Sequence, residues 1–413
     1  MRPNIDRFQK DLEALARIGR VPEGGVARFS LTPADLEGRD LVIGIMTGLG
    51  LNVRVDAVGN IRGRREGRDP ALPIVMMGSH IDSVPNGGDY DGPTGVMGPL
   101  EVVRTLNDEG IVTRHPIEVV VFTDEEGDRF KRGTLGSAIM AGHMSWDEVR
   151  DLKDDDGISF EKALEAIETT GTPGEVVLSK GEVKSFVELH VEQSARLEEK
   201  EVPIGIVEAI TGSSHKRVRV FGKADHAGAT PMGRRTDALV PAARMVQEIE
   251  RIGRSDPAAS LVSTVGYLDV KPGAMNIVPS LVTFTTDVRD TSPNNLDAAI
   301  KEIDEMIARV AGERGVEFEI EDLEYVPAVA LSPAIRSAIA DACNKLDIGY
   351  MDTASRAIHD TSHMAHVTDA GMIFVPSVGG KSHSPDELTH WEDIRPGLEV
   401  LYEVTVALAG LDA

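Results

Sequence analysis

Histidine and acidic residues gather in the stretch GSHIDSVPNGGDYDGPTG, Gly78 to Gly95, directly after the apolar run 73–77. His80 and Asp82 are two residues apart at the end of a predicted strand, so both side chains can point to the same face. There one can bind a metal ion while the other fixes its ring tautomer. Asp91 follows in a glycine-rich turn, where a carboxylate can approach an ion closely. Alone, the stretch also fits a tight acidic turn around a hydrogen-bonded histidine.

Three further stretches end apolar runs on acids or imidazoles. VVVFTDEE ends on Glu125 and Glu126, ELHVEQ contains His190, and GGKSHSPDE contains His383. Adjacent Glu125 and Glu126 can divide the work between binding an ion and transferring a proton. Each stretch follows the carboxyl end of a predicted strand, which is where ligands bind in open α/β sheets. Zinc-class metals take nitrogen and oxygen donors, and two close ions need a shared carboxylate, so the pattern predicts a metal site.

Other polar residues leave two interpretations open. His226 in KADHAGATPM has no second ligand at a suitable spacing, and the residues alone favour a structural histidine. Asn276 and Arg289 end strand-like runs. Arg289 either binds a substrate carboxylate through its guanidinium fork or pairs with Asp287 or Asp290. In HDTSHMAH, the histidines have helical spacing but lack the glutamate of a zinc-protease helix, so a separate metal there is the weaker interpretation; they are His359, His363 and His366.

Short apolar strands alternate with helices through most of the chain. Helical spacing covers 5–18 and continues from the Thr32-Pro33 cap to about Gly50. Strand-like runs lie at 51–55, 74–77, 117–122, 183–189 and 372–375, and helices are predicted at 95–109, at 333–346 and from Asp393 onward. The alternation predicts an α/β fold with a mixed, mainly parallel sheet covered by helices.

The segment 212–328 differs in character from its flanks. It is predicted to contain strands at 217–221, 261–269 and 281–287 and helices at 237–253 and 296–312, which indicates an α+β unit. The earlier alternation resumes beyond it. We therefore expect a catalytic metal-binding domain formed by 1–211 and 329–413, with an inserted domain at 212–328. A length of 413 residues suits two cores.

The composition of the chain restricts its binding partners, its location and its possible disulfides. A formal net charge of -25 would repel a phosphate backbone and an anionic membrane, so neither nucleic acid nor membrane is expected to bind. No apolar run approaches the roughly 20 residues needed to cross a bilayer, and MRPNIDRFQKDLEAL is amphipathic, which predicts a cytoplasmic location. The single cysteine, Cys343, excludes an internal disulfide and a thiolate cluster, and core packing is predicted for it.

The motifs together resemble a known family. They are, in order, GSHIDSV, GGDYDGPTGV, FTDEEGDRF, ELHVEQSARLE, ADHAGATPMGRRTDA, PGAMNIVPS, DVRD and FVPSVGGKSHSPDE. This set closely resembles the hydantoinase/carbamoylase branch of the dinuclear metallopeptidase and aminoacylase superfamily. That branch contains N-carbamoyl-L-amino acid hydrolases, β-ureidopropionases and allantoate amidohydrolases. The resemblance extends from about Phe8 to the last predicted helix.

The resemblance implies two divalent metal ions, with zinc, manganese, cobalt or nickel as candidates. By position it makes Asp91 the bridging carboxylate, gives His80 and His190 to one ion, and gives Glu126 and His383 to the other. A histidine at 190, where peptidase relatives more often carry an acid, points to the carbamoylase branch.

The resemblance also implies roles around the ions. Glu125 becomes the general base and Asp82 the partner behind His80. The inserted domain becomes a lid that also forms a homodimer, so that His226 reaches the partner's active site and stabilises the oxyanion. This replaces the structural interpretation of His226. The residues expected to contact substrate are Gln193, Asn276, Arg289 and His359.

The implied enzyme is a metal-dependent amidohydrolase that cleaves N-carbamoyl-L-amino acids to the amino acid, carbon dioxide and ammonia. Allantoate, N-carbamoyl-β-alanine and N-acyl amino acids are alternative substrates for the same site, and a metal-dependent binding protein without turnover is the alternative from another class. One motif departs from the family: 355–361 reads SRAIHDT instead of SGAGHDA. Because Arg356 and Ile358 replace glycines, the pocket and the substrate stay open, and a second acidic group bound by Arg356 is a hypothesis.

Overall fold

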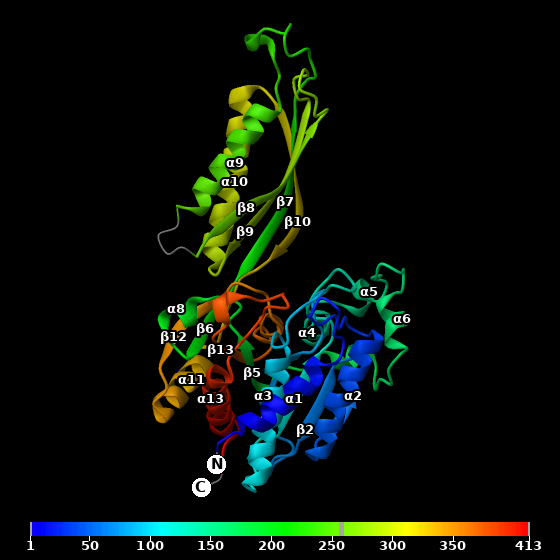
Figure 1. Ribbon diagram of the computed structural model, residues 1–413, viewed down its shortest axis with the longest axis vertical. Coiled ribbons are helices and arrows are strands. Elements are labelled where there is room, and N and C mark those ends of the chain that lie inside the picture. The colour runs from blue at the N-terminus through cyan, green and yellow to red at the C-terminus, as the bar shows by residue number, and fades with distance from the viewer. Residues whose placement is uncertain (1, 256–259, 412–413) are drawn as a thin grey trace. The chain divides into compact units, whose positions relative to one another are not determined.

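The computed structural model describes residues 2–255 and 260–411, which form two compact units (Figure 1). The large unit contains Met1–Glu208, Leu331–Thr353 and His359–Ala413, and the small unit contains Ala209–Ala330 and Ala354–Ile358. The main segment of the small unit begins three residues before the predicted start at 212 and ends two residues after the predicted end at 328. Unlike the prediction, the short segment 354–358 groups with the small unit.

The larger sheet is mixed, with a parallel centre. Its strand order is β1-β2-β4-β3-β5-β13-β6-β11, and β12 pairs with β6. The central strands β4 (Ile117–Phe122), β3 (Ile74–His80), β5 (Val183–Val191) and β13 (Asp369–Val375) are parallel to one another. The other strands are β1 (Asn52–Val55), β2 (Ile61–Arg65), β6 (Ile204–Ile210), β11 (Val329–Ala330) and β12 (Tyr350–Ser355). The predicted fold class is therefore confirmed.

Both faces of the central sheet are buried, which explains the continuous apolar runs of its strands. Along β3, Val75 and Met77 pack into one core cluster, whereas Ile74 and Met76 pack into another on the opposite face. The first cluster contains side chains of α1 (Ile5–Ala16), α2 (Pro33–Gly48), α3 (Pro93–Asp108), α11 (Pro333–Leu346) and α13 (Trp391–Ala409). The second contains side chains of α4 (Leu135–Met140), α5 (Trp146–Val149), α6 (Phe160–Leu164), α7 (Pro173–Val176) and α12 (Asp360–Met364). Cys343 is buried in the first cluster, as expected. The short α8 (Arg196–Lys200) follows β5.

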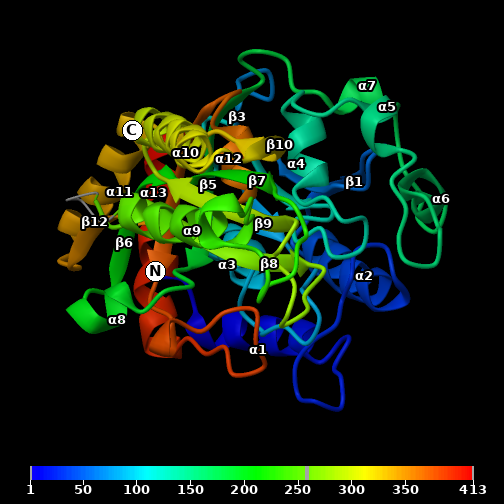
Figure 2. The ribbon, with the colours of Figure 1, turned by 90° about the horizontal axis from the view of Figure 1, so that it is seen from above.

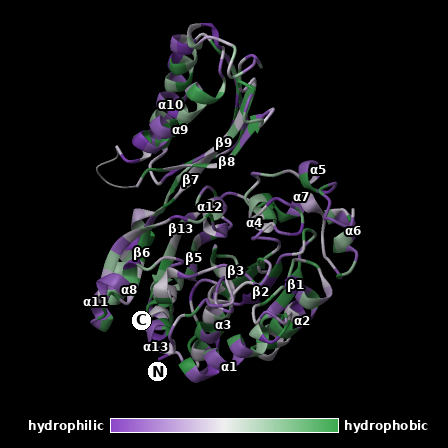
Figure 3. Ribbon diagram, turned by 45° about the horizontal axis from the view of Figure 1, so that its top comes forward, coloured by the Kyte–Doolittle hydropathy of each residue, from purple (hydrophilic) through white to green (hydrophobic). Residues whose placement is uncertain are grey.

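The small unit has its own antiparallel sheet, with strand order β10-β7-β9-β8. The strands are β7 (Gly212–Phe221), β8 (Val262–Lys271), β9 (Leu281–Asp290) and β10 (Glu317–Val326). Helices α9 (Leu239–Gly253) and α10 (Pro293–Arg314) lie side by side against one face of it and form a separate core with the strands (Figure 2). Apolar and polar residues alternate along both helices (Figure 3), because only one side of each faces this core.

Among the described residues, none of the helices combines the length and the apolar character needed to span a bilayer.

Candidate metal centre

The four motifs that carry acids or imidazoles meet at one end of the central strands. His80 is the last residue of β3, Glu125 follows β4, His190 is the penultimate residue of β5, and His383 lies in the loop after β13. These strands are neighbours in the sheet and parallel. Because parallel strands bring their carboxyl ends to one edge, the side chains converge there. Asp91 joins them from the turn before α3.

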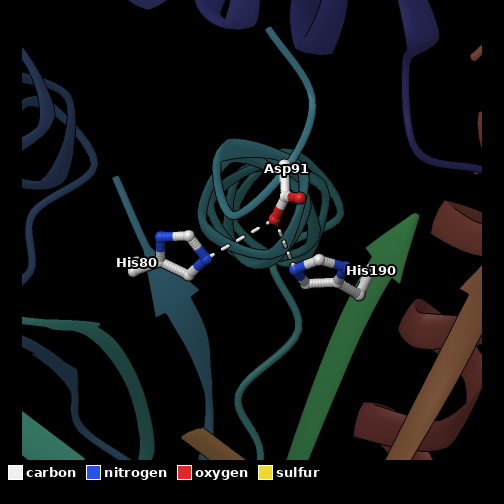
Figure 4. Close-up of side chains that lie close together, drawn as sticks. All are labelled: His80, Asp91 and His190. Atoms are coloured by element: carbon white, nitrogen blue, oxygen red, sulfur yellow. Dashed lines mark ion pairs between the residues drawn. The ribbon is translucent and has the colours of Figure 1, made fainter. Parts of the chain in front are cut away.

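Asp91 lies at the centre of the site. Its Oδ1 is 3.3 Å from His190 Nε2 and 3.7 Å from His80 Nε2 (Figure 4). Its Oδ2 is 3.5 Å from His383 Nε2, which in turn lies 3.5 Å from Glu126 Oε2. One carboxylate oxygen therefore faces two imidazoles and the other faces a third, as a carboxylate shared by two ions requires.

The two buried rings present lone pairs to Asp91. His80 Nδ1 lies 3.1 Å from the Asp82 carbonyl oxygen, and His190 Nδ1 lies 2.9 Å from the carbonyl oxygen of the next residue. A carbonyl only accepts, so each Nδ1 bears a hydrogen, and in the neutral ring the lone pair is on Nε2. The Gly92 N–H donates to His190 Nε2 at 3.3 Å, in agreement. Lone pairs and a carboxylate oxygen that face one another are stabilised by a cation between them.

The donor set fits divalent metal ions. Two groups of three have ligand atoms within 4.8 Å of one another, and both include Asp91: His80, Asp91 and His190, and Asp91, Glu126 and His383. Imidazole nitrogen and carboxylate oxygen are donors that zinc-class ions accept. The groups contain the five residues predicted as ligands, whose individual roles stay predictions.

A third group with metal-ligand geometry is explained by hydrogen bonding. Glu188, His190 and His359 also have ligand atoms within 4.8 Å of one another. Glu188, however, accepts on one carboxylate oxygen from Ser79 Oγ at 2.7 Å, and on the other from Thr361 Oγ1 at 2.5 Å and the Thr361 backbone N–H at 3.3 Å. These hydrogen bonds satisfy the Glu188 carboxylate without a cation, and they join β3 and β5 to α12.

Glu125, the predicted general base, is buried with its Oε2 3.7 Å from His80 Nε2. Burial raises the pKa of its carboxyl well above the ordinary value, and the His80 ring opposes this only partly. Asp82 holds the segment, because its carboxylate accepts from the backbone N–H of Glu125 at 3.3 Å and of Glu126 at 3.1 Å. Asp82 therefore contacts His80 Nδ1 mainly through its backbone carbonyl, with its carboxylate at 3.6 Å.

Three polar residues hold Asp91 in place, and the sequence interpretation missed two of them, Ser382 and Glu387. Asp91 Oδ2 accepts from Gln193 Nε2 at 2.7 Å and from Ser382 Oγ at 2.6 Å. Glu387 Oε1 accepts from the backbone N–H groups of Tyr90 at 2.8 Å and of Asp91 at 3.0 Å. Ser382 and Glu387 belong to the stretch already singled out for His383, so proximity to a predicted ligand was the only available signal. Gln193, predicted to contact substrate, here contacts the central carboxylate.

The small unit contains three of the predicted site residues. His226 and Asn276 lie on adjacent loops, since His226 bridges to the residue after Asn276. His226 is exposed, and its Nδ1 accepts from the backbone N–H of Gly228 at 3.0 Å, so a neutral ring has its hydrogen on Nε2. Arg289 donates from Nε and Nη2 to the two oxygens of Asp287 at 2.9 and 3.0 Å, one of the pairings left open by the sequence.

His359 lies apart from the other histidines of HDTSHMAH. It is buried, and its ring centroid is 4.5 Å from that of His190. Burial and the neighbouring His190 ring hold its pKa well below the ordinary value, which favours the neutral imidazole. Arg356, three residues earlier, is exposed in segment 354–358 of the small unit.

A mainly parallel sheet whose strand ends gather acids and imidazoles around one shared carboxylate defines a metal-dependent hydrolase. The family model for peptidase family M20/M25/M40 matches residues 76–407. The chain belongs to this family and, within it, to the hydantoinase/carbamoylase amidases.

Relatives of defined name cover nearly the whole chain. An N-carbamoyl-L-amino-acid amidohydrolase of Paenarthrobacter aurescens is 42% identical over 98% of this chain and 98% of its own length. An allantoate amidohydrolase of Escherichia coli is 33% identical over 97% of both chains. A crystal structure of an amidase of the hydantoinase/carbamoylase family from Burkholderia multivorans superposes with a TM-score of 0.91 and 38% identity, covering 99% of this chain and 98% of that chain.

Proposed function

We propose that this chain hydrolyses the carbamoyl C–N bond of N-carbamoyl-L-amino acids. Water adds to the ureido carbonyl, the bond to the amino-acid nitrogen breaks, and the carbamate formed decomposes to carbon dioxide and ammonia. The observation that carries the proposal is Asp91, which is placed between two groups of metal donors with Glu125 beside them. Its N-carbamoyl-L-amino-acid amidohydrolase relative supports the substrate class.

We propose two divalent ions at this site, drawn from zinc, manganese, cobalt and nickel. His80, Asp91 and His190 would hold one, and Asp91, Glu126 and His383 the other. When bound, such ions lower the pKa of water and polarise a carbonyl oxygen. The buried acids around Asp91 are a reason to expect cations, because unpaired buried charge is costly.

Glu125 is proposed to move the proton. Burial gives its carboxyl a raised proton affinity, so it can take a proton from the attacking water and deliver it to the departing amine nitrogen. Its backbone N–H is fixed by Asp82, which would keep the carboxyl in place between the two transfers.

The small unit is proposed to complete the site. His226 Nε2–H would donate to the developing oxyanion, and Asn276 would contact the substrate. Arg289 would bind the substrate carboxylate with the fork that now binds Asp287. We further propose that this unit closes as a lid and forms a homodimer, which would contribute His226 to the partner's site. A cytoplasmic location stays a prediction from the sequence.

Ammonia release tests the reaction. Metal-replete protein is incubated with N-carbamoyl-L-amino acids, N-carbamoyl-β-alanine, allantoate and N-acyl amino acids, with and without chelator. We expect chelator-sensitive release of ammonia and free amino acid from at least one N-carbamoyl-L-amino acid, restored by added divalent metal. Ammonia released equally with chelator would contradict the metal site, and cleavage of the N-acyl compounds alone would contradict the carbamoyl substrate.

Allantoate is the second candidate substrate. It has the same ureido group, and the relative from Escherichia coli bears that name. Arg356, in a motif where the family has glycine, is the feature of this chain that favours a substrate with a second acidic or polar group. Faster ammonia release from allantoate than from any carbamoyl amino acid in the same panel would select this candidate.

A further inference from the structure

Three histidines outside the predicted dinuclear centre face one another in the large unit. His143 follows α4, His363 lies in the last turn of α12, and His366 comes just after that helix. The ring centroids of His143 and His363 are 5.1 Å apart, and those of His143 and His366 are 4.4 Å apart. His359 lies outside this group, because it packs against His190. The neighbour of His363 is His143, which lies 220 positions earlier in the chain.

Hydrogen bonds fix which nitrogen of His363 has its lone pair free. Thr134 Oγ1 donates its one hydrogen to the Gly133 carbonyl at 2.8 Å, so it accepts from His363 Nε2 at 2.9 Å. The hydrogen of His363 is therefore on Nε2, and the lone pair of Nδ1 points toward His143. The two Nδ1 atoms are 2.8 Å apart.

A hydrogen bond also determines which nitrogen of His366 has the lone pair. Its Nδ1 lies 2.9 Å from the Ser362 carbonyl oxygen, which only accepts, so the hydrogen is on Nδ1 and the lone pair on Nε2. A backbone carbonyl behind the ring is the support that metal-binding histidines commonly have.

The spacing of the first pair suits one ion. With metal–nitrogen bonds of about 2.0–2.1 Å, two imidazole nitrogens on the same ion lie roughly 2.9–3.4 Å apart. The Nδ1 atoms of His143 and His363 are 2.8 Å apart, so they need to separate only slightly for a cation to replace the hydrogen between them. Burial, with the adjacent His143 and His366 rings, lowers the pKa of His363 to about 3, so its lone pair remains available at neutral pH.

The rings must move closer together before all three can bind one ion. The nitrogens of the three rings do not all lie within 4.8 Å of one another, unlike the donors around Asp91. His143 and His366 are both exposed, and an exposed side chain changes rotamer at little cost. Donors consisting of imidazole alone favour Zn²⁺, Ni²⁺ or Cu²⁺ over Mg²⁺ or Mn²⁺.

We propose that His143, His363 and His366 form an auxiliary site for an imidazole-preferring divalent ion that ties α12 to the segment after α4. The site does not depend on the proposed activity. Its position has a consequence for the centre, because Thr134, which binds the His363 ring, also donates its backbone N–H to the Glu125 carbonyl at 2.8 Å. An ion there would stabilise the segment that carries Glu125.

The test is the number of Ni²⁺ ions that the full-length, metal-replete protein binds in equilibrium dialysis. We expect the wild type to bind one more ion per chain than H143A/H366A, and Ni²⁺ to raise its Tm by several degrees more. H390A, which removes the exposed histidine before α13, is the matched control and should bind like the wild type. Equal binding by the wild type and H143A/H366A would overturn the proposal.

Spectroscopy distinguishes three ligands from two. Cu²⁺ is added to the same metal-replete protein, and the spectrum of H143A/H366A is subtracted. The nitrogen hyperfine pattern in electron paramagnetic resonance should indicate three imidazoles in the wild type and fewer in H363A. A wild-type pattern unchanged by H366A would show that His366 is not a ligand and would contradict the proposed site.

Discussion

Asp91 and Glu125 have opposite electrostatic surroundings although both carboxylates are buried. For Asp91, burial raises the pKa, but attraction to the His190 and His80 rings in their protonated form outweighs it and holds the pKa well below its ordinary value. For Glu125, burial dominates and raises the pKa. Two carboxylates whose surroundings separate their proton affinities are suited to different tasks. Asp91 stays ionised to bind cations, whereas Glu125 can exchange a proton.

Replacing Glu125 with glutamine tests this division of roles. Glutamine keeps the shape but cannot accept a proton, so kcat should fall by ~10²–10⁴-fold, the usual contribution of a general base. Metal content, measured by elemental analysis, should stay unchanged because the ligands around Asp91 remain. The exposed Glu165 on the same unit provides the control E165Q, which should behave like the wild type. An E125Q protein with wild-type kcat would rule out Glu125 as the base.

At the residue scale, the sequence identified the residues that converge on Asp91 more readily than the residues that hold them in place. His80, His190 and His383 were identifiable because each follows an apolar run, and burial of such a run fixes where its end lies. The hydrogen bonds that Glu387 accepts from the turn of Asp91 join positions 297 and 296 apart, and no local pattern encodes such a pairing. Arg289 has acidic neighbours at Asp287 and Asp290, and the alternation of side chains along β9 places only Asp287 on the same face as Arg289.

Among the elements, the junction between β3 and α3 brings the backbone of Gly92 close to the His80 ring. Gly92 has φ 77°, in the left-handed region, and a Cβ on it would lie 2.4 Å from His80 Cε1. The turn therefore needs glycine for both its backbone conformation and the space of the His80 ring. The end of the same helix has Gly110, with φ 64° and no heavy atom within 4 Å of a built Cβ.

These two glycines make a matched pair. G92A should displace the His80 ring, so we expect loss of bound metal and of activity, together with destabilisation of about 1–3 kcal/mol from the backbone alone. G110A carries the backbone strain without the clash and should keep its metal. Metal content and urea unfolding of both variants check the prediction. Full metal retention by G92A would mean that the ring adjusts without loss of the site.

The elements missed by the sequence interpretation have weak apolar patterns. β2 reads IRGRR, and its buried Arg62 is paired with Glu118 of β4, so a charged pair replaces the expected apolar residues. β10 reads EFEIEDLEYV, and most of its residues are exposed, consistent with its place at the edge of the small sheet. The central strands were predicted because burial on both faces gives them runs of mainly apolar residues. β6 and β12, which lie beyond β13, were missed as well.

At the scale of the whole molecule, the small unit has an unpaired strand edge. β8 is the last strand of its sheet, and Val262, Tyr267 and Leu268 are exposed along it. An edge strand with apolar side chains is prone to pair with another chain, and a second copy of the same strand is the symmetric solution. This feature supports the proposed homodimer, in which His226 would serve the partner's active site.

Complementation between two inactive variants tests that arrangement. E125Q and H226N chains, each with a different affinity tag, are co-expressed, and the mixed dimer is isolated by both tags. If His226 acts across the dimer, one site of each mixed dimer has both Glu125 and His226, so about half of the wild-type activity should return. Pure E125Q and pure H226N dimers are the controls and should stay inactive. A mixed dimer as inactive as its parents would instead place His226 in the site of its own chain, because then each site would lack one of the two residues.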